Sequence, residues 1–322
     1  MVELMGASEN CHMKIAVHTP IEQLVPDPFA GQRHADVATA TAKELVRQVP
    51  SVDALENKLL DVDQVDCPVV HRFGPGVYIR EVTLPAGTLA IGHRHKFAHI
   101  NIVLKGTVLV LNDNGTSSEI EAPFVYTSQP GRKVVLAKTE VVWQNIFATT
   151  ERDVETLEAY LLDKSDAWLE DSEVRMKAAA LRHENDRADY LAAIAEFGIT
   201  HDLAWQIASN PSDQIPMPLG SYKMIVTDSP IHGKGVFATA AIAPGELIAP
   251  ARVDGKRTPA GRYTNHAAEP NAIMVLRPNG DIDLVACKPI AGCQGGQPGE
   301  EITIDYRQAL GLSRQRSQLC QQ

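Results

Sequence analysis

The chain has 322 residues, a hydrophobic fraction of 44% and a formal net charge of −10. This length is enough for two domains that each bury a core. The acidic charge disfavours nucleic acid as the main partner, because neutralising phosphates requires a surplus of Lys and Arg. No apolar run reaches the ~20 residues of a membrane span, and the first residues lack a signal-peptide core. We therefore expect a protein of the cytoplasm, or of an assembly built there, with no nucleic-acid or membrane partner.

The five cysteines are scattered, and no two of them have the CxxC spacing of a zinc or redox site. Free thiols in a reducing compartment are the expected state. The acidic charge suits a basic peptide as a partner. A charge that only keeps the protein in solution explains the composition as well.

The first 62 residues predict an N-terminal arm followed by a helix, with helical spacing over 41–49 and 51–62. From Val69 to Phe147 the character changes to β-branched runs separated by PAG, NDNG and QPG turns. The predicted strands cover 77–84, 99–111, 124–129 and 132–137. Many short strands at this spacing indicate a sandwich or barrel, which we assign to residues 63–150.

A helical connector is predicted over residues 151–215, with Gly198 ending one helix and Thr200 capping the next. Its helical segments are 151–162, 172–197 and 201–209. The proline-rich stretch 210–221 marks the boundary to a last domain, residues 216–322. Short strands return in that domain, over 223–228, 235–240, 246–253, 272–278, 282–288 and 301–306. The fold class is therefore mainly β with a helical middle.

Three histidines lie close together in GHRHKFAHINIVLKG, residues 92–106. His93 and His95 are two apart, so on a strand they point to the same face, and His99 follows. Neutral imidazoles are the commonest protein ligands of divalent transition metals. The alternative is that these histidines are hydrogen-bonded core residues.

This segment resembles the first cupin motif, in which a glycine, five residues, HxH, an acidic ligand and a second glycine follow one another. Gly87 and Gly106 stand at the two glycine positions, and Pro130 and Gly131 resemble the turn of the second motif. The resemblance covers residues 69–147 and implies a cupin-like β-barrel.

The cupin resemblance implies a divalent transition metal held by His93, His95 and His99. His99 stands where the family has a glutamate. The histidine that normally follows the second turn is missing. A site of three histidines with open positions is compatible with metal binding.

Three further segments, in order, carry a second resemblance. SPIHGKGVFATAAIAPGELI, RYTNHAAEPNA and PGEEITIDY resemble the opening, the RFxNHxxxPN signature and the closing strand of SET domains. In that family the signature loop is threaded into a pseudoknot. The matched region is 222–307, and it implies a SET-like β-clip domain.

SET domains transfer a methyl group from S-adenosylmethionine to a protein lysine, so the resemblance implies a lysine-containing peptide or protein as substrate. The reaction needs a neutral amine held in line with the methyl carbon and partly dehydrated. Tyr306 matches the catalytic tyrosine. The positions that match cofactor-binding residues are Lys234, Gly235, Tyr263, Asn265 and His266. The alternative is that these side chains only hold the fold together.

The chain departs from the SET pattern between Pro250 and Arg262, where a short loop replaces the lobe that binds the substrate peptide. APARVDGKR replaces an aromatic-x-Gly-Glu segment, and the cysteine-rich tail is missing. Two functions therefore stay open. One is a protein-lysine methyltransferase, and the other is a non-catalytic structural, decoration or assembly protein of a virion. The order of the domains resembles proteins encoded by tailed bacteriophages.

We also expect a homo-oligomer, in the form of a closed ring or trimer. Both β-rich parts have edge strands that need cover, and residues 172–197 carry an apolar stripe. The short loop over 250–262 is expected to leave the SET-like surface open. Symmetric closure would satisfy every copy equally.

Overall fold

The computed structural model describes residues 39–40, 42–44, 51–111 and 116–319, and for 313–319 the backbone alone. The helix predicted over 41–49 lies mostly outside these residues. Helix α2 (Val52–Leu60) confirms the next prediction, and the Ser51 side chain caps it by accepting a hydrogen bond from the Ala54 amide. Among the described helices none is both long and apolar enough to cross a membrane.

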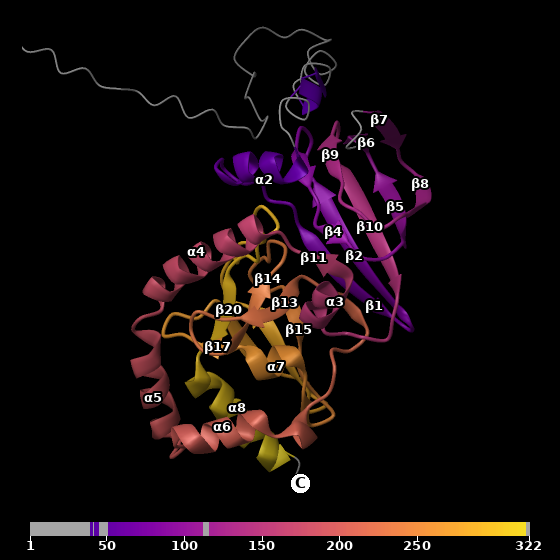
Figure 1. Cartoon of the computed structure of the whole chain (residues 1–322). Coiled ribbons are helices and arrows are strands. Elements are labelled where there is room, and N and C mark those ends of the chain that lie inside the picture. The colour runs from indigo at the N-terminus through magenta and orange to yellow at the C-terminus, as the bar shows by residue number, and fades with distance from the viewer. Residues whose placement is uncertain (1–38, 41, 45–50, 112–115, 320–322) are drawn as a thin grey trace, which may run out of the picture.

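Residues 69–148 form two antiparallel sheets, called the barrel below (Figure 1). One sheet has the order β12-β1-β2-β10-β5-β8, in which the edge strand β12 (Gly220–Tyr222) comes from a later part of the chain, and the other has the order β3-β9-β6-β7. The strands of the barrel are β1 (Val69–Gly74), β2 (Val77–Leu84), β3 (Leu89–Ile91), β5 (His99–Lys105), β6 (Thr107–Leu111), β7 (Ser117–Glu121), β8 (Phe124–Ser128), β9 (Val134–Ala137) and β10 (Val141–Ala148). The strands predicted for this part are therefore confirmed.

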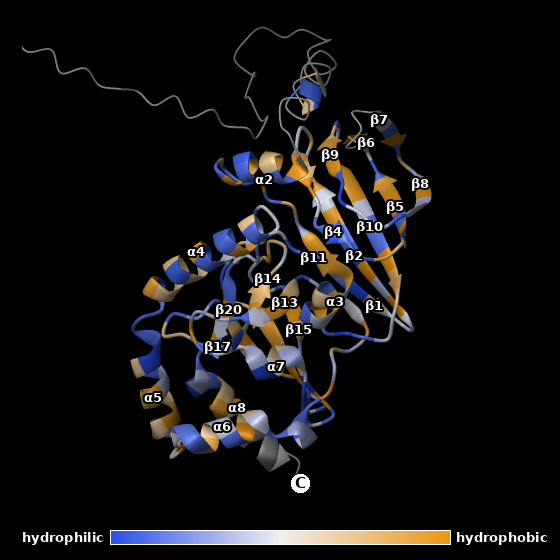
Figure 2. Ribbon diagram, viewed as in Figure 1, coloured by the Kyte–Doolittle hydropathy of each residue, from blue (hydrophilic) through white to orange (hydrophobic). Residues whose placement is uncertain are grey.

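Period-two alternation decides which side chains face the interior of the barrel. In β10, Val141, Trp143, Asn145 and Phe147 are buried, and the residues between them are less so. Burying an apolar side chain of this kind contributes ~1.5–3 kcal/mol. Figure 2 shows the corresponding hydrophobic colouring along the strands of the barrel.

The connector consists of α3 (Val154–Leu161), α4 (Asp166–Arg182), α5 (Asp186–Glu196) and α6 (His201–Ser209). The helical run predicted over 172–197 is divided, and the hydrogen bond of 2.7 Å between His183 Nδ1 and Asp186 Oδ2 spans the turn. Gly198, with φ of +70°, ends α5, and Thr200 caps α6 as expected. A short pair, β4 (Arg94–His95) with β11 (Leu162–Asp163), fastens the connector to the barrel.

The C-terminal module, residues 224–319, contains two four-stranded sheets and two helices. The first sheet is β13 (Met224–Asp228), β14 (Lys234–Ala238), β20 (Glu301–Ile304) and β17 (Asn265–His266). The second is β16 (Lys256–Arg257), β15 (Leu247–Val253), β19 (Ile282–Ala286) and β18 (Ala272–Leu276). The helices are α7 (Pro259–Tyr263) and α8 (Tyr306–Leu319). In Figure 1, α4, α5 and α6 form an arc around this module.

The barrel has hydrophobic clusters of its own, and a further cluster joins it to the C-terminal module. Strand β12 (Gly220–Tyr222), which follows the proline-rich stretch, pairs with β1 and so extends the sheet of the barrel. The Val69 amide donates to the Thr239 carbonyl oxygen over 2.8 Å, and the Thr239 hydroxyl donates to the Val69 carbonyl oxygen over 2.7 Å. A single hydrophobic cluster runs from Phe73 in the barrel to Ile302 in the module. The two β-rich parts are therefore not independent units.

Candidate functional site

The segments singled out near the C-terminus converge on one sheet. Lys234 and Gly235 begin β14, Asn265 and His266 form β17, and Tyr306 begins α8 two residues after the last residue of β20. Strand β20 lies between β14 and β17. Five of the six residues expected at a methyl-transfer site are therefore neighbours in space, although they are distant in sequence.

Asn265 connects this site to the turn between β13 and β14. Its Nδ2 atom lies 2.7 Å from Glu301 Oε1, 3.0 Å from Ser229 Oγ and 3.1 Å from the Lys234 carbonyl oxygen. The amide thereby fixes the separation of β17 and β14, which lie on opposite sides of β20.

Glu301 is a buried carboxylate of the PGEEITIDY segment. The sequence analysis did not identify it as a site residue. A Cβ atom at Gly235 would lie 2.2 Å from Glu301 Oε1, so a side chain there would displace this carboxylate. Burial raises the pKa of Glu301, and hydrogen bonds from Asn265 and Ser229 oppose that change.

His266 and Tyr306 are fixed by hydrogen bonds through both ring nitrogens of the histidine. His266 Nδ1 accepts from the Tyr306 amide over 3.1 Å, and Nε2 lies 2.9 Å from Asp189 Oδ2. The Tyr306 hydroxyl donates to the Thr264 carbonyl oxygen over 3.2 Å. Burial raises the pKa of Tyr306, so its hydroxyl stays protonated at neutral pH.

Helix α5 covers this part of the module, a feature that the sequence did not predict. Asp189 accepts two hydrogen bonds of 2.9 Å from the Arg307 guanidinium. These bonds, together with the one from His266, lower the pKa of Asp189 to about 2. The Ala268 amide donates to Asp186 Oδ1 over 3.0 Å. The loop after β17 is thus held to the connector by two carboxylates.

Two of the predicted residues have their side chains engaged elsewhere. The Lys234 ammonium forms an ion pair with Glu155 of α3, which raises the pKa of the lysine. Only the backbone of Lys234 therefore belongs to the site. Tyr263 ends α7, and the Arg262 guanidinium lies 4.9 Å from the centre of its ring. Tyr263 packs partly buried against the hydrophobic core.

The segment 250–262 was expected to leave the surface open, and the structure places the end of the connector against it. The Asp213 carboxylate accepts from Arg252 over 2.9 Å and from Arg257 over 2.8 Å. The Ile215 amide donates to the Arg257 carbonyl oxygen over 2.9 Å. The end of the connector thus covers part of the segment 250–262.

The three histidines of the barrel are not arranged as one metal centre. The rings of His95 and His99 stack with centroids 4.2 Å apart, whereas His93 meets the Trp168 ring edge-on at 5.1 Å. Within the described residues no group of three or more His, Cys, Asp or Glu side chains could hold a metal ion. The divalent metal expected at His93, His95 and His99 therefore has no counterpart in this arrangement of side chains. It stays a prediction of the sequence.

His99 lies beside a buried network of hydrogen-bonded side chains. Asn101 Oδ1 accepts from Trp143 Nε1 over 2.9 Å and from Asn145 Nδ2 over 2.8 Å. The same Asn145 amide lies 3.4 Å from His99 Nε2. The Nδ1 atoms of His93 and His95, by contrast, are buried without a hydrogen-bond partner among the described residues.

No protein-family model matches the chain, and no curated protein matches it. Several solved structures are similar to it. A cupin superfamily protein from Desulfitobacterium hafniense is 10% identical, with 29% of this chain and 86% of that chain covered and a TM-score of 0.23. An RmlC-like cupin family protein with a double-stranded β-helix fold, from Methanocaldococcus jannaschii, is 14% identical, with 26% and 83% covered and a TM-score of 0.23.

A cupin-2 domain protein from Shewanella frigidimarina is also 14% identical, with 24% of this chain and 74% of that chain covered and a TM-score of 0.21. These proteins are cupins, the family that residues 69–147 resemble. The SET-like and bacteriophage assignments stay predictions.

Proposed function

We propose that the C-terminal module is a SET-like domain that binds S-adenosylmethionine and methylates a lysine of a peptide or protein. The observation that supports this proposal is the convergence of Lys234, Gly235, Asn265 and His266 on one sheet, with Tyr306 bonded to His266 at its edge. S-adenosylmethionine would supply the methyl group. The side chains of this chain would bind the cofactor and orient the amine.

The proposed role of Tyr306 follows from its protonated, buried hydroxyl. A neutral hydroxyl beside the Thr264 carbonyl oxygen can orient a neutral amine without adding charge near the sulfonium. Lys234 would contribute backbone groups, because its ammonium is paired with Glu155. Asn265 would contact the amino-acid end of the cofactor.

Isothermal titration calorimetry with S-adenosylmethionine tests the binding step. We expect weak binding to the wild-type chain and none to Asn265→Ala. Because the Asn265 amide also joins β17 to Glu301, the thermal melt and circular dichroism of the variant must show that it is folded. No heat of binding at millimolar cofactor would contradict the proposal.

Tyr306→Phe separates binding from chemistry, since it removes the hydroxyl and keeps the ring. We expect this variant to bind the cofactor as the wild type does and to lose methyl transfer to lysine-containing peptides. Tyr190→Phe is the matched control, because the Tyr190 ring lies 5.7 Å from that of Tyr306 and its hydroxyl bonds to His201. Equal transfer by the wild type and Tyr306→Phe would remove Tyr306 from the mechanism.

A second candidate function is a non-catalytic structural or assembly role, for example as a virion component carried from the host cytoplasm. The observation that favours it is the cover provided by α5, which uses His266 Nε2 and the Ala268 amide for contacts within the chain. Absence of cofactor binding in a folded wild-type chain would support this alternative.

A further inference from the structure

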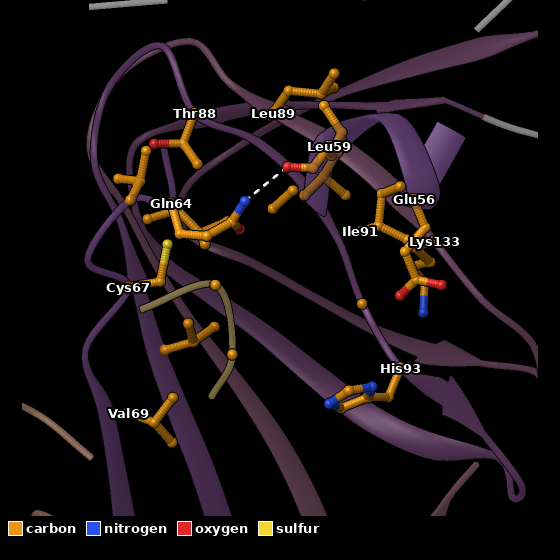
Figure 3. Close-up of a pocket in the computed structure, with 18 of the residues that line it drawn as sticks. Glu56, Leu59, Gln64, Cys67, Val69, Thr88, Leu89, Ile91, His93 and Lys133 are labelled. Carbon is orange, nitrogen blue, oxygen red and sulfur yellow. Dashed lines mark hydrogen bonds between the residues drawn. The ribbon is translucent and has the colours of Figure 1, made fainter. Parts of the chain in front are cut away.

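A cavity of about 240 Å³ lies inside the barrel (Figure 3). A water molecule occupies ~30 Å³ in the liquid, so this space suits a small organic molecule better than a single ion. Much of its wall is apolar and comes from α2 and from strands of both sheets. These residues include Leu59, Val82, Leu84, Leu89, Ile91 and Val135.

Two cations also line the cavity. Arg80 is on β2 and Lys133 immediately precedes β9. Among the described residues neither side chain has a hydrogen bond or an ion pair within 4 Å, and Arg80 Nε is fully buried. Burial lowers the pKa of Lys133, as expected for an ammonium without a counter-ion.

Both cations line the cavity together with His95. Burial, the neighbouring His99 and the charges of Lys133 and Arg80 lower the pKa of His95 to about 3. The acidic side chain of Glu56, which also lines the cavity, is paired with Arg132. The buried Glu158, which pairs with Lys164, is near enough to Arg80 to interact with it electrostatically. Among the described residues, however, no carboxylate lies within hydrogen-bond distance of Arg80 or Lys133.

Elements from outside the barrel also line the cavity. Gln64 donates to the Leu59 carbonyl oxygen over 2.6 Å, and the Gly295 amide donates to the Val65 carbonyl oxygen over 3.3 Å. Gly295 and Gly296 belong to the C-terminal module, and both line the cavity. Trp168 of α4 lines it as well, with its Nε1 buried and unpaired among the described residues.

We propose that this cavity binds a small monocarboxylic acid with an apolar body, with the carboxylate at Arg80 and Lys133 and the body along the leucine and valine wall. Both cations are partly buried, and a charge removed from water without a hydrogen-bonded partner is costly, so a ligand carboxylate would supply that partner. The apolar wall would exclude water around the rest of the molecule. This site is separate from the proposed methyl-transfer site.

Tryptophan fluorescence provides a direct assay, because two of the three tryptophans, Trp143 and Trp168, line the cavity. The third, Trp205, is 59% exposed on α6, and Trp205→Phe removes its signal. We expect octanoate to change the emission of this variant in a saturable way and 1-octanol to bind about tenfold more weakly or less. No change at millimolar octanoate, or equal binding of both probes, would overturn the proposal.

Charge-removing variants locate the carboxylate. Arg80→Gln and Lys133→Gln are each expected to weaken octanoate binding by about tenfold or more. Arg72→Gln is the matched control on the neighbouring strand, because Arg72 pairs with Glu81 and does not line the cavity. Equal affinities for Arg72→Gln, Arg80→Gln and Lys133→Gln would contradict the assignment. If one cavity variant fails to fold, the other still decides.

Amide hydrogen exchange tests whether the C-terminal module contributes to the binding site. We expect octanoate to slow exchange in the peptide that contains 293–297 and to leave that of β18 and β19 unchanged. Uniform protection of the whole chain, or none at 293–297 with saturating octanoate, would place the ligand elsewhere.

Discussion

Gly106 shows how a single residue fixes the turn between β5 and β6. Its φ is +86°, and a Cβ atom there would lie 2.1 Å from the Glu140 carbonyl oxygen. Gly245 has nearly the same φ, +82°, but open space around the missing Cβ. The two glycines therefore separate the cost of a left-handed backbone from the cost of a collision with a neighbouring chain segment.

We predict that Gly245→Ala lowers the free energy of unfolding by ~1 kcal/mol, the strain of a left-handed alanine. Gly106→Ala should lower it by clearly more, since the backbone of Glu140 must also move. Urea denaturation of both variants measures the difference. Equal losses would show that the turn at Gly106 relaxes freely.

Helix α5 is held against the C-terminal module by side-chain contacts of Asp189. Asp189 and Asp202 both stand in the first turn of a helix, so both interact favourably with its N-terminal dipole. Only Asp189 also bonds to Arg307 and His266. Comparing these two residues isolates the contribution of the contact between α5 and the module.

We predict that Asp189→Asn lowers the melting temperature by a few degrees at neutral pH and that Asp202→Asn changes it less. The pKa of Asp189 in the folded chain, about 2, is below the ordinary value of ~3.9. Its stabilising effect is therefore complete above pH ~4 and is lost as the pH falls towards ~2. Thermal melts across this range should show the wild type and Asp189→Asn converging; a constant difference would contradict this account.

The elements could be predicted where the signal is local, as in the β-branched run of β2 or the cap at Thr200. The pairing of β12 with β1 could not, because a three-residue strand carries no information about a distant partner. The same holds for Asp189 and His266, which are 77 residues apart and meet only through the tertiary fold. The motifs identified the residues that converge near Tyr306, and gave no indication that α5 covers them.

At the scale of the whole molecule, large apolar side chains remain exposed on two surfaces. Strand β8 is an edge of its sheet, and Val125 on it is 62% exposed. On the connector, Val174 is 65% and Leu181 is 73% exposed. Orange patches along α4 to α6 in Figure 2 show this second surface. Both surfaces are suited to contacts between copies of the chain.

We predict that the purified chain is a homo-oligomer, with a closed ring or trimer as the expected form. Light scattering at micromolar concentration measures its mass. Val125→Lys should reduce the mass if the β8 edge forms the contact, and Val174→Lys should do so if the connector forms it. A monomeric wild-type chain would contradict the prediction.

The strand β12 also has a consequence for synthesis on the ribosome. Ser221 bonds to Arg72, and these residues are 149 positions apart. At ~5–20 residues per second, the outer edge of β1 would wait roughly 7 to 30 seconds for its partner strand to be translated. During that interval the nascent barrel exposes an unpaired sheet edge. The growing chain would therefore be a natural client for ribosome-associated chaperones until the start of the C-terminal module emerges.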